Sequence, residues 1–341
     1  MKLYNVAVVG ATGAVGEEIL RVLEERDFPI ANLVPLASAR SAGTKVTFKD
    51  DEVTVLELTE TVFTEQNIEI ALFSAGGSVS AKFAPFAAAA GAVVIDNTSH
   101  FRMDSDVPLV VPEVNPEDIG EWTTKGIIAN PNCSTIQMVI ALKPLDALFD
   151  IQRIDVATYQ ATSGAGASAM EELVNQMQAF FSFKLDECEP TKFPHRIALN
   201  VIPQIDSFTE SGYTKEELKM VNETKKIMHK DIPVSATCVR VPILRGHSES
   251  VTIKCAKPLD LDLVRSTLAN AEGVKLVDDP ANKLYPMPMV ATERDETFVG
   301  RLRVDLYDPT ILHMWVVADN LRVGAATNAV RIAQKWIAGA F

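Results

Sequence analysis

Residues 1–130 alternate between short β-like runs and segments whose apolar positions repeat at helical spacing. Residues 3–9 are β-rich, and residues 17–26, which follow a glycine-containing turn, carry apolar side chains three and four positions apart. Further β-like runs occupy residues 32–38, 68–76 and 92–99, with helix-compatible segments between them. Alternation of this kind is typical of an α/β domain in which helices cover both faces of a parallel sheet.

The pattern changes after the stretch NPNCST, residues 130–135. The spacing of apolar residues predicts a helix over 134–149, although Pro144 is expected to kink or divide it because proline lacks a backbone donor. Longer β-type runs follow, with few helices among them, at residues 153–161, 237–243, 249–255 and 311–319. These runs predict a mixed α+β domain with a largely antiparallel sheet.

The C-terminal segment, residues 320–341, again has apolar positions at helical spacing, and Asn320 offers a capping side chain at its start. We expect this helix to pack against the first domain. Two domains are expected because 341 residues exceed the usual size of one hydrophobic core. The predicted domains are residues 1–129 with 319–341, and residues 130–318.

The charge balance limits the classes of partner. Lys and Arg total 32 against 45 Asp and Glu, a formal net charge of −13, which argues against nucleic acid and anionic membrane surfaces. The longest apolar run, residues 83–95, contains Pro85 and Gly91 and is shorter than the roughly 20 residues that cross a bilayer. We therefore expect a soluble cytoplasmic protein that binds neither nucleic acid nor membrane.

The four cysteines, Cys133, Cys188, Cys238 and Cys255, are scattered without C-x-x-C spacing. This distribution suggests neither a disulfide framework nor a zinc site, so reduced thiols and no bound metal are expected. Of the four, Cys188, Cys238 and Cys255 are interpreted as structural.

Three glycines, Gly10, Gly13 and Gly16, follow a predicted strand and open a predicted helix. In that context the backbone N–H groups of the helix N-terminus can hold a pyrophosphate. The motif therefore predicts a Rossmann-type dinucleotide-binding domain, and the alternative is a plain tight turn.

The residues after the second β-like run bear on which dinucleotide is bound. Folds that prefer NAD usually place Asp or Glu there, whereas a basic residue accommodates the 2′-phosphate of NADP. Here Ser38, Arg40 and Ser41 supply donors and a positive charge without a carboxylate. NADP is therefore the predicted cofactor, and the alternative is a solvated surface arginine.

Cys133 lies in the stretch NPNCST, between helix-capping residue types and directly before an apolar run. A helix N-terminus lowers the pKa of a thiol from about 8.5 and so favours the reactive thiolate. A single cysteine is otherwise more often a small buried residue, so the assignment as a nucleophile depends on other regions.

Three other regions carry side chains suited to chemistry around such a thiol. Gln160 ends a predicted strand and precedes a glycine-rich loop able to approach a ligand closely. Arg240 and His247 lie seven residues apart, with Gly246 beside the histidine, as expected of a strand leading into a turn. Arg102, in the stretch SHFRM, is a candidate anion clamp.

With these motifs the chain closely resembles the aspartate-β-semialdehyde dehydrogenases, and among them the form found in Gram-positive bacteria. The resemblance runs from residue 2 to residue 341 and includes GATGAVG, SHFRM, NPNCST, YQATSGAG, EELK, VRVPILRGH and ADNLRVGAA, in that order. It implies NADPH-dependent reduction of L-aspartyl 4-phosphate to L-aspartate 4-semialdehyde and phosphate. This step leads to lysine, diaminopimelate, methionine and threonine. The resemblance also implies a homodimer formed through the second domain.

The resemblance implies a role for each candidate residue. Cys133 is the nucleophile that forms an acyl-thioester, His247 is the acid/base that carries the thiol proton, and Gln160 orients the acyl group. Arg240 pairs with the substrate α-carboxylate, Glu216 faces the substrate amino group, and Arg102 and Lys219 hold the phosphate. The cofactor site is assigned to Gly10, Thr12, Gly13, Ala14, Val15, Ser38, Arg40, Ser41, Ser163, Gly164 and Asn320.

Other functions remain as alternatives. An N-acetyl-glutamyl-phosphate reductase would share the two-domain plan and the Cys/His chemistry, but its substrate amine is acylated and needs no Glu216 carboxylate. A catalytically silent paralogue that serves only as a binding protein should have lost Cys133. A short-chain dehydrogenase would need a Tyr-x-x-x-Lys pair on one helix, which we do not find in a suitable place.

Overall fold

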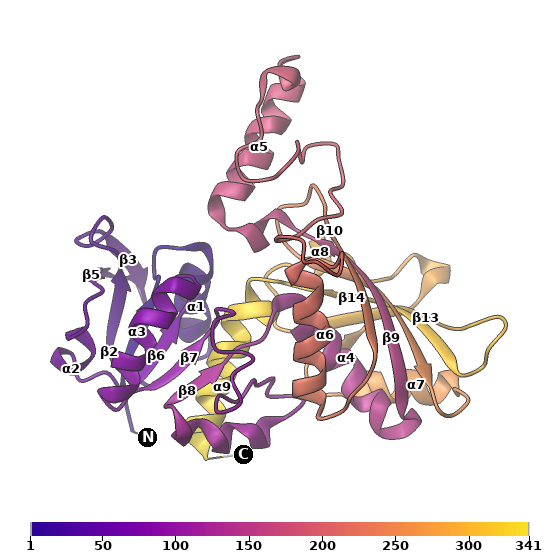
Figure 1. Ribbon diagram of the computed structural model, residues 1–341, viewed down its shortest axis with the longest axis horizontal. Coiled ribbons are helices and arrows are strands. Elements are labelled where there is room, and N and C mark those ends of the chain that lie inside the picture. Colours follow the sequence, from indigo (N-terminus) through magenta and orange to yellow (C-terminus); the bar gives the residue numbers. More distant parts are fainter. Residues whose placement is uncertain (1, 340) are drawn as a thin grey trace. The chain divides into compact units, whose positions relative to one another are not determined.

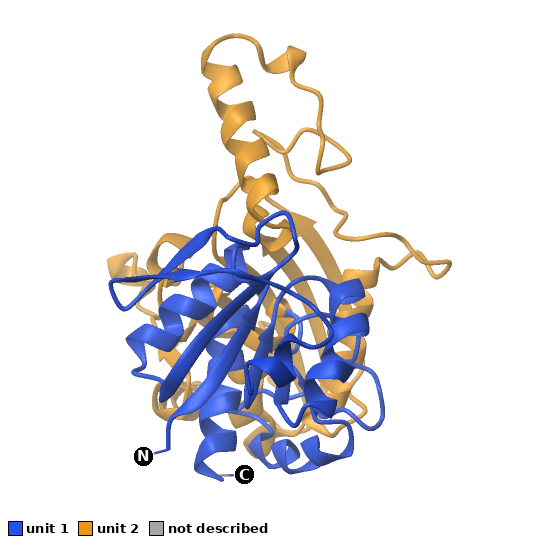
Figure 2. Cartoon of the chain, turned by 90° about the vertical axis from the view of Figure 1, so that its left-hand side faces the viewer, with its two compact units in different colours: residues 1–132, 324–341 blue, residues 133–323 orange. Residues whose placement is uncertain are grey.

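The computed structural model describes residues 2–339 and 341. The chain forms two compact units, coloured separately in Figure 2. Unit 1 comprises residues 1–132 and 324–341, and unit 2 comprises residues 133–323. The sequence predicts divisions after residues 129 and 318, whereas the units divide after residues 132 and 323.

Unit 1 contains a six-stranded sheet in the order β5-β2-β1-β6-β7-β8, and every neighbouring pair in it is parallel (Figure 1). A separate antiparallel hairpin joins β3 to β4. The strands are β1 (Tyr4–Val9), β2 (Ile30–Ala37), β3 (Lys45–Phe48), β4 (Asp51–Thr54), β5 (Leu56–Glu57), β6 (Ile70–Phe73), β7 (Val93–Asp96) and β8 (Ile127–Ala129). The α-helices are α1 (Ala14–Glu25), α2 (Val62–Glu65), α3 (Gly77–Ala89) and α9 (Thr327–Ala338), with a 3-10 helix at Pro116–Thr124.

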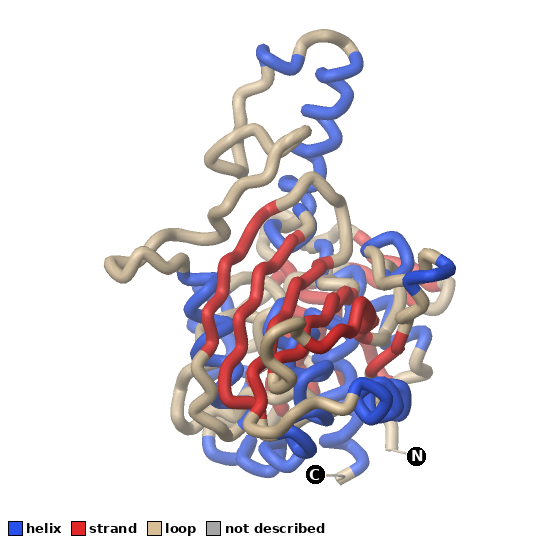
Figure 3. The backbone as a smooth tube through the Cα atoms, turned by 90° about the vertical axis from the view of Figure 1, so that its right-hand side faces the viewer, coloured by secondary structure: helices blue, strands red, loops and turns tan. Residues whose placement is uncertain are grey.

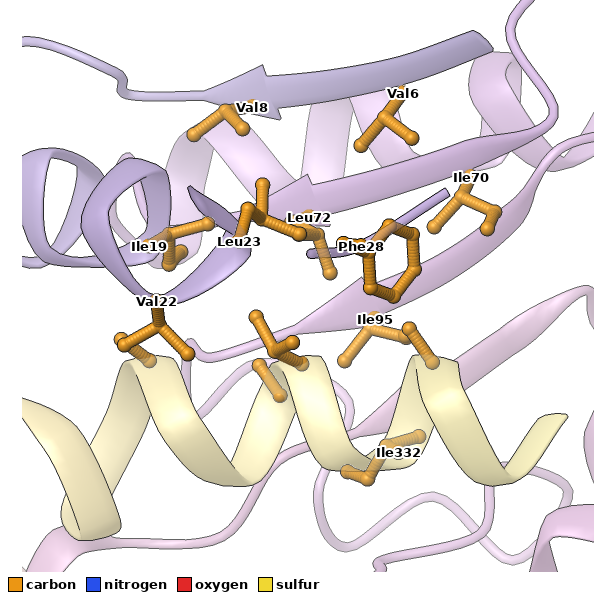
Figure 4. Close-up of a cluster of buried hydrophobic side chains, with 14 of the residues drawn as sticks. Val6, Val8, Ile19, Val22, Leu23, Phe28, Ile70, Leu72, Ile95 and Ile332 are labelled. Atoms are coloured by element: carbon orange, nitrogen blue, oxygen red, sulfur yellow. The ribbon is translucent and has the colours of Figure 1, made fainter. Parts of the chain in front are cut away.

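Helices lie on both faces of this sheet because its strands are apolar on both sides. Figure 4 shows side chains of α1, β1, β6, β7 and α9 in one buried cluster, with Ile95 of β7 among them. The next residue, Asp96, points to the other face, where it accepts a 2.8 Å hydrogen bond from Ser80 of α3. The parallel α/β domain predicted for this part of the chain is therefore confirmed.

Unit 2 contains a six-stranded sheet in the order β10-β9-β11-β14-β13-β12 (Figure 3). The three inner pairs are antiparallel, whereas the edge pairs β10–β9 and β12–β13 are parallel. The sheet is mixed, as predicted. Its strands are β9 (Ile151–Gln160), β10 (Val234–Arg240), β11 (His247–Cys255), β12 (Val274–Leu276), β13 (Thr297–Val304) and β14 (Ile311–Ala318).

The helices of unit 2 are more numerous than the sequence pattern indicates. α4 packs against α6, α7 and four strands of the sheet, and α5 with the segment after it extends away from the sheet (Figure 1). The α-helices are α4 (Cys133–Phe149), α5 (Ala167–Phe181), α6 (Lys215–Met228), α7 (Leu261–Asn270) and α8 (Pro288–Ala291). Shorter turns are 3-10 helices at Thr162–Ala165, Leu185–Glu187 and Pro280–Asn282, and a π-helical turn at Arg322–Ala326.

Two local predictions need correction. Of the two outcomes expected at Pro144, division of the helix does not occur, because α4 is buried over most of its length and its packing compensates for the lost backbone hydrogen bond. Asn320 does not cap α9, which begins only at Thr327, after the π-helical turn. The side chain of Asn320 is instead engaged with Ser163 and Gly246. Among residues 2–339 and 341, no helix combines the length and apolarity needed to cross a bilayer.

Candidate active site

The glycine turn of unit 1 borders a pocket of about 490 Å³. The pocket is lined from three sides: by the turn between β1 and α1, by the residues after β2, and by the start of α3 with the loop before it. The lining residues are Gly10, Thr12, Gly13, Ala37, Ser38, Arg40, Ser41, Leu58, Ser74, Ala75, Val79 and Phe83. Ala14 and Val15, also assigned to the cofactor, are the first two residues of α1.

Two of the three glycines of this turn, Gly10 and Gly16, are required by close approach. A Cβ at position 16 would lie 2.1 Å from the backbone oxygen of Gly10, and one at position 10 would lie 3.0 Å from the backbone of Ser74. Gly10 also has φ +86°, which favours glycine. No side chain caps the start of α1. The turn therefore presents a backbone cradle at a helix N-terminus, which fits a pyrophosphate.

No carboxylate is among the residues that line this pocket, whereas Ser38, Arg40 and Ser41 all line it. A ribose with a free 2′-hydroxyl would normally meet an acidic side chain here, and a 2′-phosphate would meet a cation. The side chains present therefore fit NADP better than NAD.

Arg102 is also in unit 1, where it is buried and its guanidinium donates hydrogen bonds to backbone carbonyl groups. Its Nε donates to the carbonyl of Asn130 at 2.9 Å and its Nη2 donates to the carbonyl of Asn97 at 2.7 Å. Asn328 of α9 donates to the Asn130 side chain. Arg102 thus anchors the NPNCST segment three residues before Cys133, a contact that the sequence did not suggest.

In unit 2, three of the predicted residues lie at one end of adjacent strands. Gln160 ends β9, Arg240 ends β10 in direct register with it, and His247 begins β11, the other neighbour of β9. Cys133 is half-buried and begins α4, which packs against β9 and β11. The fold therefore brings together residues that are far apart in the sequence.

The backbone of Ala161 connects two of these side chains. Its N–H donates to Nδ1 of His247 at 3.1 Å, and its carbonyl accepts from Nη1 of Arg240 at 2.6 Å. His247 is fully buried, and burial followed by the charge of Arg240 lowers its pKa to about 3. Burial also lowers the pKa of Arg240, against the opposing effects of Glu216 and Cys133.

Gln160 belongs to a chain of polar contacts that ends at the surface. Its Oε1 accepts from Thr158, and its Nε2 donates to Glu216 at 3.1 Å. Lys219, one turn further along α6, donates to the other oxygen of Glu216 at 3.0 Å. Burial would lower the pKa of Lys219, but Glu216 and Asp206 raise it above its usual value. Glu216 and Lys219, three positions apart on α6, therefore point the same way.

The glycine-rich loop after β9 packs directly on this cluster. A Cβ at Gly164 would lie 2.9 Å from Nη1 of Arg240 and 3.2 Å from Nε2 of His247. Ser163 and Asn320 hydrogen-bond to each other, and Asn320 also accepts from the N–H of Gly246. The three residues of unit 2 assigned to the cofactor therefore lie in the same polar network as His247.

The sequence analysis did not identify several groups that belong to this cluster. Asp319 is fully buried and accepts a hydrogen bond from Arg245 at 2.7 Å, so its carboxylate compensates the charge of Arg245. Glu249 is also fully buried, two residues after His247 on the same face of β11. Alternation along the strand could have indicated Glu249, but no sequence signal marks the backbone of Ala161.

Comparison with known proteins identifies the family. The semialdehyde dehydrogenase NAD binding domain matches residues 5–122, and the semialdehyde dehydrogenase dimerisation domain matches residues 142–323. An aspartate-semialdehyde dehydrogenase of Campylobacter jejuni is 63% identical over 98% of both chains. The chain belongs to the aspartate-semialdehyde dehydrogenase family. It is therefore an oxidoreductase, as predicted.

Other members of the family extend the similarity to structure. The Bacillus subtilis aspartate-semialdehyde dehydrogenase is 53% identical and covers 97% of this chain and 96% of its own. The crystal structure of aspartate-semialdehyde dehydrogenase II from Vibrio cholerae, complexed with ASA, is 48% identical with a TM-score of 0.96 over 100% of both chains. A Candida albicans enzyme with NADP is 26% identical, with a TM-score of 0.75 over 97% of this chain and 98% of its own. The resemblance to the Gram-positive form in particular stays a prediction.

Proposed function

We propose that this chain catalyses the NADPH-dependent reductive dephosphorylation of L-aspartyl 4-phosphate to L-aspartate 4-semialdehyde through a thioester on Cys133. The observation that carries the proposal is the convergence of Gln160, Arg240 and His247 at one end of three adjacent strands, two of which pack against the helix that begins at Cys133. Family membership supplies the reaction, which leads to lysine, diaminopimelate, methionine and threonine.

The chemistry begins with attack of the Cys133 thiolate on the acyl carbon, which releases phosphate. A thioester accepts hydride far more readily than a carboxylate does, so the covalent step makes the reduction feasible. The nicotinamide supplies the hydride when NADPH is bound. The sulfur then leaves and the semialdehyde is released.

Each polar side chain is assigned to one group of the substrate. Arg240 pairs with the α-carboxylate, Glu216 meets the amino group, and Gln160 orients the acyl group. Arg102 and Lys219 bind the phosphate, and His247 handles protons at the reacting centre. Burial of Gln160, Arg240 and His247 supports these assignments, because charged hydrogen bonds are stronger where water is excluded.

The pocket in unit 1 supports NADP as the cofactor. Its glycine turn and the start of α1 are assigned to the pyrophosphate, and Ser38, Arg40 and Ser41 to the 2′-phosphate. Ala14 and Val15 follow in α1, and Ser163, Gly164 and Asn320 of unit 2 complete the proposed cofactor site.

Oligomeric state and location are part of the same proposal. A homodimer is supported by the match to the dimerisation domain over residues 142–323. All four cysteines are free thiols, which suits a reducing compartment such as the cytoplasm.

The reaction is tested by following NADPH absorbance after mixing the protein with NADP, aspartate semialdehyde and inorganic phosphate. We expect phosphate-dependent NADPH formation that disappears in Cys133→Ala but persists in Cys188→Ser, a matched control at a half-buried thiol outside the site. Turnover of N-acetyl-glutamate semialdehyde in place of aspartate semialdehyde would contradict the proposed substrate. Binding of NADP without any turnover would favour a silent paralogue.

A further inference from the structure

Two arginines of unit 2 are held in different ways. Arg245 donates to the buried carboxylate of Asp319 at 2.7 Å, which compensates its charge. Arg240 is 5% exposed and donates through Nη1 to the carbonyl of Ala161 at 2.6 Å. Among the described residues Arg240 donates to no carboxylate, although Glu216 attracts its charge. The guanidinium of Arg240 therefore keeps N–H groups available for a ligand.

The guanidinium of Arg240 also contacts the face of an aromatic ring. Its Cζ lies 6.0 Å from the centroid of the Phe193 ring, and Phe193 is 9% exposed. The face of the ring is partially negative and attracts a cation, most strongly where both groups are removed from water. Unlike a carboxylate, the ring neither neutralises the arginine nor uses its N–H donors. The contact with Phe193 can therefore hold the guanidinium and leave its donors for a planar, bidentate carboxylate.

The position of Phe193 is fixed by α5, the helix that extends away from the sheet (Figure 1). Buried Glu172 of α5 accepts hydrogen bonds at Oε2 from the N–H of Thr191 at 3.0 Å and from the N–H of Lys192 at 2.6 Å. The Thr191 hydroxyl donates to the same oxygen at 2.7 Å. Phe193 follows directly and packs in one hydrophobic cluster with Leu173 of α5. The ring is therefore anchored on both its backbone and its side-chain side.

The segment after Phe193 continues to the backbone of Arg240. Oε1 of buried Gln176, also on α5, accepts from the N–H groups of residues 197 and 198 at 3.0 Å each. Ile202 then pairs with Arg240 at the outer edge of β10, where each N–H donates to the carbonyl of the other, at 2.9 Å and 2.8 Å. The segment that α5 holds therefore contacts both the side chain and the backbone of Arg240.

We infer that Phe193 is a positioning residue whose ring, held by α5, orients the guanidinium of Arg240 to receive the α-carboxylate of the substrate. The inference rests on the proposed function, in which Arg240 pairs with that carboxylate. It adds a determinant of substrate affinity from a part of unit 2 that has no assigned role. Two parallel N–H···O bonds require the guanidinium and the carboxylate to share a plane, so fixing that plane favours binding. Phe193 contributes to binding and not to the chemical step.

The test replaces Phe193 by a trifluorinated phenylalanine, which keeps the shape of the ring but removes most of the negative charge from its face. Steady-state NADPH formation is measured with each substrate varied in turn. We expect KM for aspartate semialdehyde to rise by about threefold or more, while kcat and the KM values for NADP and phosphate change by less than about twofold. Phe193→Leu, which removes the ring, should raise KM for aspartate semialdehyde by about 5- to 30-fold, and Phe193→Tyr should restore most of the affinity.

Phe181→Leu is the matched control, because Phe181 lies on the same helix and is 73% exposed, and it should leave all three KM values unchanged. If Phe193→Leu does not fold, the fluorinated protein, whose ring fills nearly the same volume, decides the matter. An unchanged KM for aspartate semialdehyde in the fluorinated protein would overturn the inference. Equal increases in all three KM values would also overturn it, because they would indicate a general structural role. No turnover by the unsubstituted protein would instead refute the proposed function, and with it this inference.

Discussion

The nucleotide pocket of unit 1 and the polar cluster of unit 2 are built in different ways. The pocket depends on a short glycine turn whose backbone must approach other backbone closely, as the 2.1 Å separation between a Cβ at Gly16 and the Gly10 oxygen indicates. The cluster depends on side chains from α4, β9, β10, β11 and α6 that meet only after the sheet has formed. Substitutions in the glycine turn of the pocket should therefore alter cofactor binding through backbone geometry. Substitutions in the cluster should alter activity and stability through charge and the positions of protons.

The largest effect is expected from removing the nucleophile. Cys133→Ser should reduce turnover by about 10⁴-fold or more, because the hydroxyl is far less ionised than a thiol. NADPH affinity, measured by the quenching of protein fluorescence, should change less than about threefold, since the cofactor pocket lies in unit 1. A loss of NADPH binding equal to the loss of activity would mean that the two regions are not separable.

A backbone change should damage the pocket more than a charge change does. In Gly16→Ala the new Cβ would overlap the Gly10 oxygen, so we expect NADPH affinity to fall by at least about tenfold and unfolding free energy by about 1–3 kcal/mol. Gly77→Ala is the matched control, because its Cβ would find no atom closer than 4.0 Å. Titration with NADPH and urea unfolding measure the two quantities. If Gly16→Ala left both NADPH affinity and unfolding free energy unchanged, the close approach of the two backbone segments would be contradicted.

A more selective effect is expected when the charge is removed from the pocket. Arg40→Gln should weaken NADP by about 10- to 100-fold, the value of a hydrogen bond to a charged group, and should leave NAD affinity nearly unchanged. Arg21→Gln, at an exposed arginine on α1 whose pairing with Glu18 is long at 3.7 Å, is the control. Isothermal titration with each dinucleotide is the measurement. Equal losses for NADP and NAD would remove Arg40 from the 2′-phosphate site.

A further effect concerns stability rather than activity. Burial raises the pKa of Glu249 well above 4.5, with Gln137 offsetting part of the shift, and neither carboxyl oxygen makes a hydrogen bond of normal geometry among the described residues. Between the unfolded pKa near 4.5 and the higher folded pKa, Glu249 is therefore protonated in the folded state and ionised in the unfolded state. Because the folded state then binds the extra proton, stability falls as pH rises.

The isosteric change Glu249→Gln removes this dependence. Relative to the unsubstituted protein, the variant should gain up to about 1.4 kcal/mol of unfolding free energy for each pH unit above the unfolded pKa, and nothing below it. Urea unfolding at several pH values between about 4 and 8 measures the difference. Parallel stability curves would show that Glu249 titrates alike in both states.

The histidine of the cluster contributes with the opposite slope. Its folded pKa of about 3 lies below the unfolded value near 6.5, so the unfolded state binds the extra proton between them. Stability from His247 is present above about pH 6.5 and is lost as pH falls towards 3. His247→Gln should therefore flatten the acid side of the stability curve while leaving the neutral side in place.

The contrast between the regions also explains what could be predicted from the sequence. The glycine turn, the alternating strands and the pairing of Glu216 with Lys219 are local patterns, and the structure agrees with them. The anchoring of Asn130 by Arg102, the ion pair of Arg245 with Asp319 and the Ala161 contacts join distant segments or use backbone atoms. No spacing in the sequence encodes such contacts.

Two errors have the same origin. Proline weakens a helix by its local geometry, but the burial of α4 outweighs that preference at Pro144. Asn320 has a residue type suited to a cap, yet Ser163 and Gly246, which are distant in sequence, engage its side chain instead. In both cases tertiary contacts override the local preference.

The most direct test of the account is to look for the thioester itself. The protein is mixed with aspartate semialdehyde and NADP in the absence of phosphate, quenched in acid, and digested for mass spectrometry. We expect one aspartyl group to be added to the peptide containing Cys133, and added phosphate to remove it. An unmodified Cys133 in a sample that reduces NADP, or an acyl group on another residue, would contradict it.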